Sequence, residues 1–278
     1  MYTNAMSVIA IIIFILGLVI GSFMNALVWR IKLKQPIGGS ERSVCDFCGK
    51  TLTALELIPV ISWAVQRGRC RSCGKKLSII HPIFELVMGF AFLSTFIFWP
   101  SELHAIVDQF LFAGWLAILA GLLAIALYDI KWMLIPDRVL FPLYGLQTVR
   151  VLVQAIAQND TGVVLTALGG VAVGGGLFYV LFQLSRGRWI GGGDVKLGFL
   201  LGSLLGPYES LLMLFISSLL GLVVTVPFLL TKKLDRKQQF PYGPFLILAA
   251  ILCVLFGEML IDFYTINLLQ LGDIYSKT

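Results

Sequence analysis

The chain has 278 residues, of which 58% are hydrophobic and 13% are charged, and its net charge is +6. Soluble domains carry about 25% charged residues, so this composition excludes an ordinary water-soluble fold and predicts an integral membrane protein. Because the basic residues flank apolar runs, we interpret them as signals of membrane topology and of contact with anionic lipid, and we expect no nucleic-acid partner.

Apolar runs of near 20 residues recur along the chain, and each is long enough to cross a hydrocarbon core about 30 Å thick. Their continuity excludes the alternating pattern of a membrane β-barrel. We therefore expect an all-α polytopic membrane protein with about eight transmembrane helices, one of them short, at residues 6–28, 80–98, 105–127, 138–157, 163–184, 195–206, 209–231 and 242–263. The run at 195–206 is too short to span alone, so seven spans and a re-entrant segment remain an alternative.

A polar insert, residues 30–79, separates the first two predicted spans and holds ten of the 21 Lys and Arg residues. With eight spans, the insert falls on the same side as the loops near 128–138, 185–196 and 232–237, and together these segments hold 19 of the 21. The positive-inside rule then predicts that the insert is cytoplasmic and that both termini lie outside. We expect a multi-pass membrane protein whose insert lies on the cytoplasmic side.

The insert contains two Cys-x-x-Cys pairs, Cys45 with Cys48 and Cys70 with Cys73, and Gly-Lys follows each pair. Such a turn directs two sulfurs at one metal ion, and the glycine permits the tight backbone. The doubled motif predicts one closed site of four thiolates that holds structural zinc. Disulfides or unrelated cysteines are the alternatives, and a cytoplasmic location disfavours disulfides.

Two aspartates mark the ends of apolar runs on the same predicted side of the membrane. Asp129 closes a long run, and Asp194 opens one directly after the glycines at 191–193. A single aspartate there is ordinarily a helix cap. Two of them, one beside a glycine run that lets a substrate backbone approach, favour a catalytic pair. Residues with a substrate-binding or loop-shaping role would be Gly191, Gly192, Gly193 and Lys196.

Several stretches together resemble a known family. They run from Gly21 to Arg30, from Cys45 to Glu85, from Tyr128 to Asp137, from Gly191 to Asp194 and from Pro241 to Phe245. The two aspartate motifs are similar to those of the GxGD aspartyl proteases. The full set resembles the type IV prepilin peptidases, and the competence-type branch is nearest.

This resemblance implies that Asp129 and Asp194 are catalytic and that Asp137 is not. It implies a membrane aspartic endopeptidase that removes leader peptides from type IV prepilins or pseudopilins at the cytoplasmic face. It also implies N-methylation of the new N-terminus with S-adenosylmethionine. The parts would be a first transmembrane helix at 1–29, the zinc-binding insert at 30–79, the transmembrane peptidase core at 80–265 and a tail at 266–278.

Two alternatives remain at this point: another GxGD intramembrane protease, and a transporter with a cytoplasmic zinc module whose acids are ion ligands. Within a protease, two close carboxylates share one proton because the first ionisation opposes the second. The helix dipole favours Asp194, at a helix start, as the anion, and Asp129, at a helix end, as the acid. The individual prepilin and the oligomeric state stay open.

Overall fold

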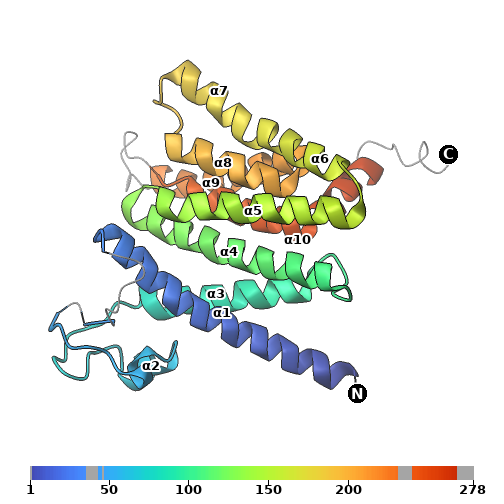
Figure 1. Ribbon diagram of the computed structural model, residues 1–278. Coiled ribbons are helices and arrows are strands. Elements are labelled where there is room, and N and C mark those ends of the chain that lie inside the picture. The colour runs from blue at the N-terminus through green and yellow to red at the C-terminus, as the bar shows by residue number, and fades with distance from the viewer. Residues whose placement is uncertain (1, 36–42, 46, 231–239, 268–278) are drawn as a thin grey trace. The chain divides into compact units, whose positions relative to one another are not determined.

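The computed structural model describes residues 2–35, 43–45, 47–230 and 240–267 (Figure 1). Among these residues the long elements are all helices, which confirms the predicted all-α class. Seven helical stretches are long and apolar enough to cross a membrane, namely Met6–Lys32, Ile80–Ile97, Ile106–Trp132, Asp137–Gln158, Gly162–Ser185, Pro207–Pro227 and Gly243–Phe263. The predicted tail at 266–278 and the basic loop at 232–237 fall almost wholly outside the described residues.

The chain divides into two compact units, one made of Met1–Trp99 with Leu119–Leu127 and the other of Pro100–Ile118 with Tyr128–Thr278. In the first unit, helix α1 (Tyr2–Lys32) packs along helix α3 (Ile80–Ile97). Glycines bring the two backbones together: a Cβ on Gly17 would lie 2.8 Å from the Cα atom of Gly89. Small residues at such crossings allow the close helix packing on which association in lipid depends.

The part of the polar insert between α1 and α3 that the structure describes forms little regular structure. It contains a short 3₁₀ helix, η1 (Ala54–Leu57), a short helix, α2 (Ile61–Val65), and two isolated antiparallel bridges, Val44 with Thr51 and Arg69 with Lys76. Each bridge closes the chain immediately around one Cys-x-x-Cys pair. Over residues 43–45 and 47–79, little secondary structure therefore holds the insert together.

The second unit is built from helices α4 to α10, apart from the middle of α4, which groups with the first unit. These helices are α4 (Ile106–Trp132), α5 (Asp137–Gln158), α6 (Gly162–Gly170), the π-helical turn η2 (Val171–Gly175), α7 (Gly176–Ser185), α8 (Gly192–Leu205), α9 (Pro207–Leu230) and α10 (Gly243–Asn267). Figure 1 shows α6, η2 and α7 following one another as one long helix.

Helix α8 is the predicted short span. Its 14 residues reach about 21 Å at 1.5 Å per residue, less than the bilayer core, and it is not among the seven candidate spans. It contacts η2, α6, α7, α5, α9 and α10, so other helices surround it. Because neighbouring helices shield its ends from lipid, a helix that is too short to cross the bilayer can begin and end inside a helix bundle.

Glycines on α8 and on the α6–η2 stretch allow this arrangement. A Cβ on Gly170 would overlap the backbone carbonyl oxygen of Gly202, and a Cβ on Gly202 would overlap that of Gly170. At Gly198, an added Cβ would lie 2.8 Å from the carbonyl oxygen of Gly174. The backbones thus meet where no side chain fits, and this contact fixes the position of α8.

We predict that Gly170→Ala destabilises the protein, because backbone must shift to admit the methyl group, at a cost of about 1–3 kcal/mol. The matched control is Gly176→Ala on the same long helix, where an added Cβ meets nothing within 4 Å. Thermal unfolding in detergent should show a midpoint several degrees lower for the first variant and an unchanged or slightly higher midpoint for the control. Equal midpoints would contradict the glycine contact.

Candidate active site and candidate metal centre

Asp129 lies in the last turn of α4, inside the helix and not after it, because α4 continues to Trp132 and ends at Met133 in the left-handed conformation. The side chain is buried, with the residue 5% exposed. Its carboxylate accepts a hydrogen bond from the backbone N–H of Gly243, the first residue of α10. A Cβ at position 243 would lie 2.7 Å from Oδ2 of Asp129, so a larger residue there would push the carboxylate aside.

Asp194 is the third residue of α8, and its carboxylate accepts a hydrogen bond from the backbone N–H of Gly191, the residue that caps the helix. An acid at this position commonly completes a helix start in this way. A Cβ on Gly191 would lie 3.2 Å from Oδ2 of Asp194, and one on Gly193 would press on the side chain of Ile135, again at 3.2 Å. The glycines thus shape the loop around Asp194, while Gly192 only approaches Phe182.

The two carboxylates are close enough to interact electrostatically. Burial and, after it, the negative charge of Asp129 together raise the pKa of Asp194 to about 6, against the hydrogen bond from Gly191. Because two adjacent anions repel each other in a poorly solvated place, the pair holds one proton over a wide pH range. The helix dipole was expected to stabilise the Asp194 anion, but burial and the charge of Asp129 oppose this effect. The assignment of Asp194 as the base and Asp129 as the acid therefore gains no support.

Lys196 does not join the carboxylate pair. Its Nζ atom lies 2.9 and 3.0 Å from the two carboxylate oxygens of Asp137, and both side chains are about half exposed. The backbone carbonyl of Lys196 also accepts a hydrogen bond of 2.5 Å from the Tyr144 hydroxyl. Two contacts therefore tie the start of α8, which carries Asp194, to α5.

Sequence reasoning missed the role of Gly243 and the ion pair of Asp137 with Lys196. Gly243 stands in the stretch Pro241 to Phe245, which was noted only for its family likeness. No local pattern links it to Asp129, which lies more than 100 residues earlier in the chain. Only the packing of α10 against the rest of the second unit brings the two together.

The four cysteines of the insert come together as the doubled motif predicts. The sulfur atoms of Cys45, Cys48, Cys70 and Cys73 all lie within 4.8 Å of one another, and none forms a disulfide. A tetrahedral site with metal–sulfur bonds of about 2.3 Å requires sulfurs about 3.8 Å apart. The cluster therefore fits a metal ion with small adjustments of its side chains.

The two knuckles have the same backbone geometry. The N–H groups of Gly49 and Gly74 each donate 2.9 Å hydrogen bonds to the carbonyls of Cys45 and Cys70, and both glycines have positive φ, +68° and +69°. Backbone N–H groups of Cys73 and Ser72 lower the pKa of the Cys70 thiol to about 6. Against a hydrogen bond from the backbone of Lys50, burial and the other three cysteines raise the pKa of the Cys48 thiol to about 11, so the two knuckles differ in how readily their thiols ionise without a metal ion.

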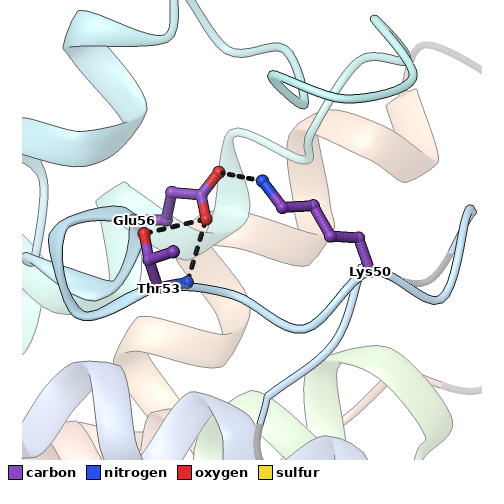
Figure 2. A network of polar contacts seen from close by, with 3 residues as sticks. All are labelled: Lys50, Thr53 and Glu56. Carbon is purple, nitrogen blue, oxygen red and sulfur yellow. Dashed lines mark hydrogen bonds and ion pairs between the residues drawn. The ribbon is translucent and has the colours of Figure 1, made fainter.

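A polar network supports the first knuckle (Figure 2). The buried carboxylate of Glu56 accepts hydrogen bonds from the backbone N–H of Thr53 at 2.9 Å and from its hydroxyl at 3.0 Å. Lys50, two residues after Cys48, adds an ion pair at 3.3 Å. These contacts join the knuckle to η1 and hold the loop between them in place.

Seven candidate spans, an interacting pair of aspartates and a four-cysteine module define a multi-pass membrane protein with two neighbouring carboxylates and an insert whose cysteines could hold a metal ion. The chain belongs to the type IV leader peptidase family. The model described as "Type IV leader peptidase family" matches residues 116–226, and the model described as "Bacterial Peptidase A24 N-terminal domain" matches residues 15–99.

Curated relatives are similar in sequence to this chain over nearly its whole length. A "Prepilin leader peptidase/N-methyltransferase" of Bacillus subtilis (strain 168) is 33% identical over 253 residues, which cover 91% of this chain and 96% of the relative. A protein of the same name from Aeromonas hydrophila is 28% identical, with 93% and 94% covered. The "Type 4 prepilin-like proteins leader peptide-processing enzyme" of Escherichia coli O78:H11 is 32% identical, with 90% and 94% covered. No solved structure matches the chain significantly.

Proposed function

We propose that this chain is a membrane aspartic endopeptidase that removes the leader peptide from type IV prepilins or pseudopilins, with Asp129 and Asp194 as its catalytic pair. The observation that carries the proposal is the meeting of these two carboxylates, one from the end of α4 and one from the start of α8, in a place where they do not both ionise readily. The names of the relatives supply the substrate class.

The shared proton provides both parts of the chemistry. The ionised carboxylate takes a proton from water, and the water oxygen then attacks the scissile carbonyl carbon. The protonated carboxyl donates a hydrogen bond to the carbonyl oxygen and stabilises the charge that develops there. When the C–N bond breaks, a proton passes to the leaving nitrogen. Either aspartate can start as the base in this scheme, since the pair titrates as a unit.

The surroundings of the pair support this role. The N–H groups of Gly243 and Gly191 hold the two carboxylates in place from α10 and from the loop before α8. The ion pair of Lys196 with Asp137 fixes the first turn of α8 against α5. We therefore assign Lys196 a positioning role in place of the substrate contact expected from the sequence, and the glycines at 191 and 193 a loop-shaping role.

The location follows from charge. The positive-inside rule supports a cytoplasmic position for the insert and for both aspartates, in a bacterial cytoplasmic membrane. A leader peptide would then be cut at that face. The insert would bind one structural zinc ion through Cys45, Cys48, Cys70 and Cys73. N-methylation of the new N-terminus with S-adenosylmethionine would be a second activity of the same chain, as the relatives' names suggest.

We predict that Asp129→Asn and Asp194→Asn each abolish cleavage of a purified prepilin, because the amide can neither take nor donate the required proton. Asp137→Asn is the matched control, since it weakens the contact to Lys196 without touching the pair, and it should retain part of the activity. Gel or mass-spectrometric assay of leader removal measures all three. Near-normal cleavage by either of the first two variants would refute the catalytic pair.

The cleavage rate should fall as the pH rises above about 6. The proposed mechanism needs one proton on the pair. Beside a charged Asp129, Asp194 has a raised pKa of about 6, so the pair loses this proton as the pH rises through about 6. Below that value the proton is retained, and activity declines again only when both carboxyls are protonated. Single-turnover rates from pH 4 to 9 measure this profile. A rate that is constant from pH 5 to 9 would contradict a shared proton.

Freshly purified protein should contain one zinc ion per chain, because four thiolates in this arrangement form a closed tetrahedral site. Cys73→Ser should remove most of the zinc and lower the thermal midpoint. Cys253→Ser, at a buried cysteine of α10 far along the sequence, is the matched control and should keep its zinc. Elemental analysis by mass spectrometry gives the ratio, and a wild-type protein without metal would overturn the assignment.

A further inference from the structure

Helix α10 begins with one backbone N–H that the helix itself does not use. Of its first four residues, Pro244 has no N–H, and the two residues that follow it donate to the carbonyl of Tyr242 at 3.1 and 3.2 Å. The N–H of Gly243 is left, and it donates to the Asp129 carboxylate. Unused N–H groups at the start of a helix commonly bind anions in this way. The orientation of one peptide group therefore decides whether Asp129 keeps this contact.

Tyr242, the residue before that donor, is anchored through its side chain. Its hydroxyl oxygen lies 2.6 Å from Oγ of Ser217 on α9. Ser217 is fully buried and donates its own proton to the carbonyl of Leu214 at 3.0 Å. Because a serine hydroxyl has only one proton, Tyr242 is the donor of the shared bond and Ser217 is its acceptor. A hydrogen bond of fixed direction thus joins the start of α10 to the middle of α9.

Phe178 contacts the same tyrosine ring from another helix. The rings of Phe178 and Tyr242 meet edge to face, with centroids 6.0 Å apart and planes at 82°, an arrangement that aromatic pairs favour. Phe178 lies on α7 and is buried, and its Cδ2 atom would lie 2.8 Å from a Cβ on Gly198 of α8. Gly198 comes four residues after Asp194. The ring that packs on Tyr242 therefore also packs on the helix that carries the second aspartate.

Gly243 needs such restraint from its neighbours. Glycine has more backbone freedom than any other residue, and it has no side chain through which its backbone could be fixed. A Cβ at this position would press on the Asp129 carboxylate, so a bulkier, stiffer residue cannot take its place without displacing the acid. The carbonyl of Tyr242 and the N–H of Gly243 belong to one planar peptide group, so a fixed Tyr242 also fixes the direction of this N–H.

We propose that Tyr242 is a positioning residue for the peptidase reaction, whose hydroxyl, held by Ser217, directs the N–H of Gly243 at the Asp129 carboxylate. The inference rests on the proposed catalytic role of Asp129. Tyr242 transfers no proton in this scheme and acts through the backbone of Gly243. A catalytic carboxylate that loses its fixed donor spends less time in the reactive geometry, and small displacements of this kind slow the chemical step.

Steady-state cleavage of a purified prepilin by the full-length, zinc-loaded protein tests this role. Ser217→Ala and Tyr242→Phe each remove one end of the hydrogen bond, and phenylalanine keeps the ring against Phe178. Each variant should lower kcat roughly fivefold to tenfold, as expected for one neutral hydrogen bond, and leave KM unchanged. The double variant should be no slower than either single variant, because both changes remove the same bond. Effects that multiply in the double variant would overturn the proposal.

Two matched controls separate this bond from general effects of the substitutions. Ser218→Ala removes the neighbouring hydroxyl of α9, which also donates to the carbonyl of Leu214, at 2.7 Å. Tyr208→Phe removes the hydroxyl of a tyrosine that is 74% exposed. Both should cleave the prepilin as wild type does. A loss of kcat in these controls equal to that in Ser217→Ala and Tyr242→Phe would refute a specific role.

Nuclear magnetic resonance reports on the N–H of Gly243 itself, without an activity assay. Isotopic labelling of tyrosine carbonyl carbons and glycine nitrogens selects Tyr–Gly pairs, of which the sequence has two, ending at Gly145 and Gly243. A hydrogen bond to a carboxylate shifts an amide proton to lower field, so Asp129→Asn identifies the Gly243 signal. Ser217→Ala should move this signal upfield, while the Gly145 signal stays in place and shows that the protein is folded. Ser218→Ala should move neither signal.

The outcomes separate this inference from the proposed function. Wild-type protein that does not cleave a prepilin removes the catalytic pair and, with it, the role of Tyr242. A wild-type enzyme whose kcat is unchanged by both Ser217→Ala and Tyr242→Phe, or whose Gly243 signal is unmoved by Ser217→Ala, overturns the positioning role and leaves the aspartate pair intact. A lower kcat at constant KM, together with a displaced Gly243 signal, supports it.

Discussion

The mutual repulsion of two carboxylates, Asp129 buried and Asp194 partly buried, is the constraint on which the account of this protein depends. Asp129 and Asp194 interact in a poorly solvated place, so the second ionisation is unfavourable and one proton remains with the pair. In the proposed reaction, a protonated acid and an ionised base are then available together at pH values up to about 6. The rest of the second unit holds these two groups together against their repulsion.

Backbone contacts provide most of that support. Glycines at 170, 198 and 202 let α8 approach the α6–η2 stretch so closely that no side chain would fit. Gly243 places the N–H of α10 against Asp129, and Gly191 does the same for Asp194. The ion pair of Lys196 with Asp137 adds a tie from α5 to the first turn of α8. Close backbone contacts at glycines thus position both carboxylates within the second unit.

The sequence was sufficient for those features that depend on local pattern. Apolar runs located every long helix to within a few residues, and the short run at 195–206 became the short helix α8. The Cys-x-x-Cys-Gly-Lys repeat predicted the four-sulfur cluster, because a tight turn with a glycine of positive φ is a local property. The end of α4 was placed before Asp129, since the polar residues after Leu127 hid five further helical positions.

Features that depend on packing could not be obtained in this way. Gly243 and Asp129 are brought together by helices distant in sequence, and the partner of Lys196 is on another helix. The same limit applies to the first unit, where the bond of the Glu85 carboxylate to the N–H of Val60 is a tertiary contact that no spacing rule predicts.

The most direct measurement is the mass of a purified prepilin after incubation with the purified wild-type protein in detergent. The account predicts two products, the intact leader peptide and the mature pilin, whose masses sum to that of the prepilin plus one water. A prepilin that remains intact in the presence of folded, zinc-loaded protein would contradict the central claim that this aspartate pair cuts peptide bonds.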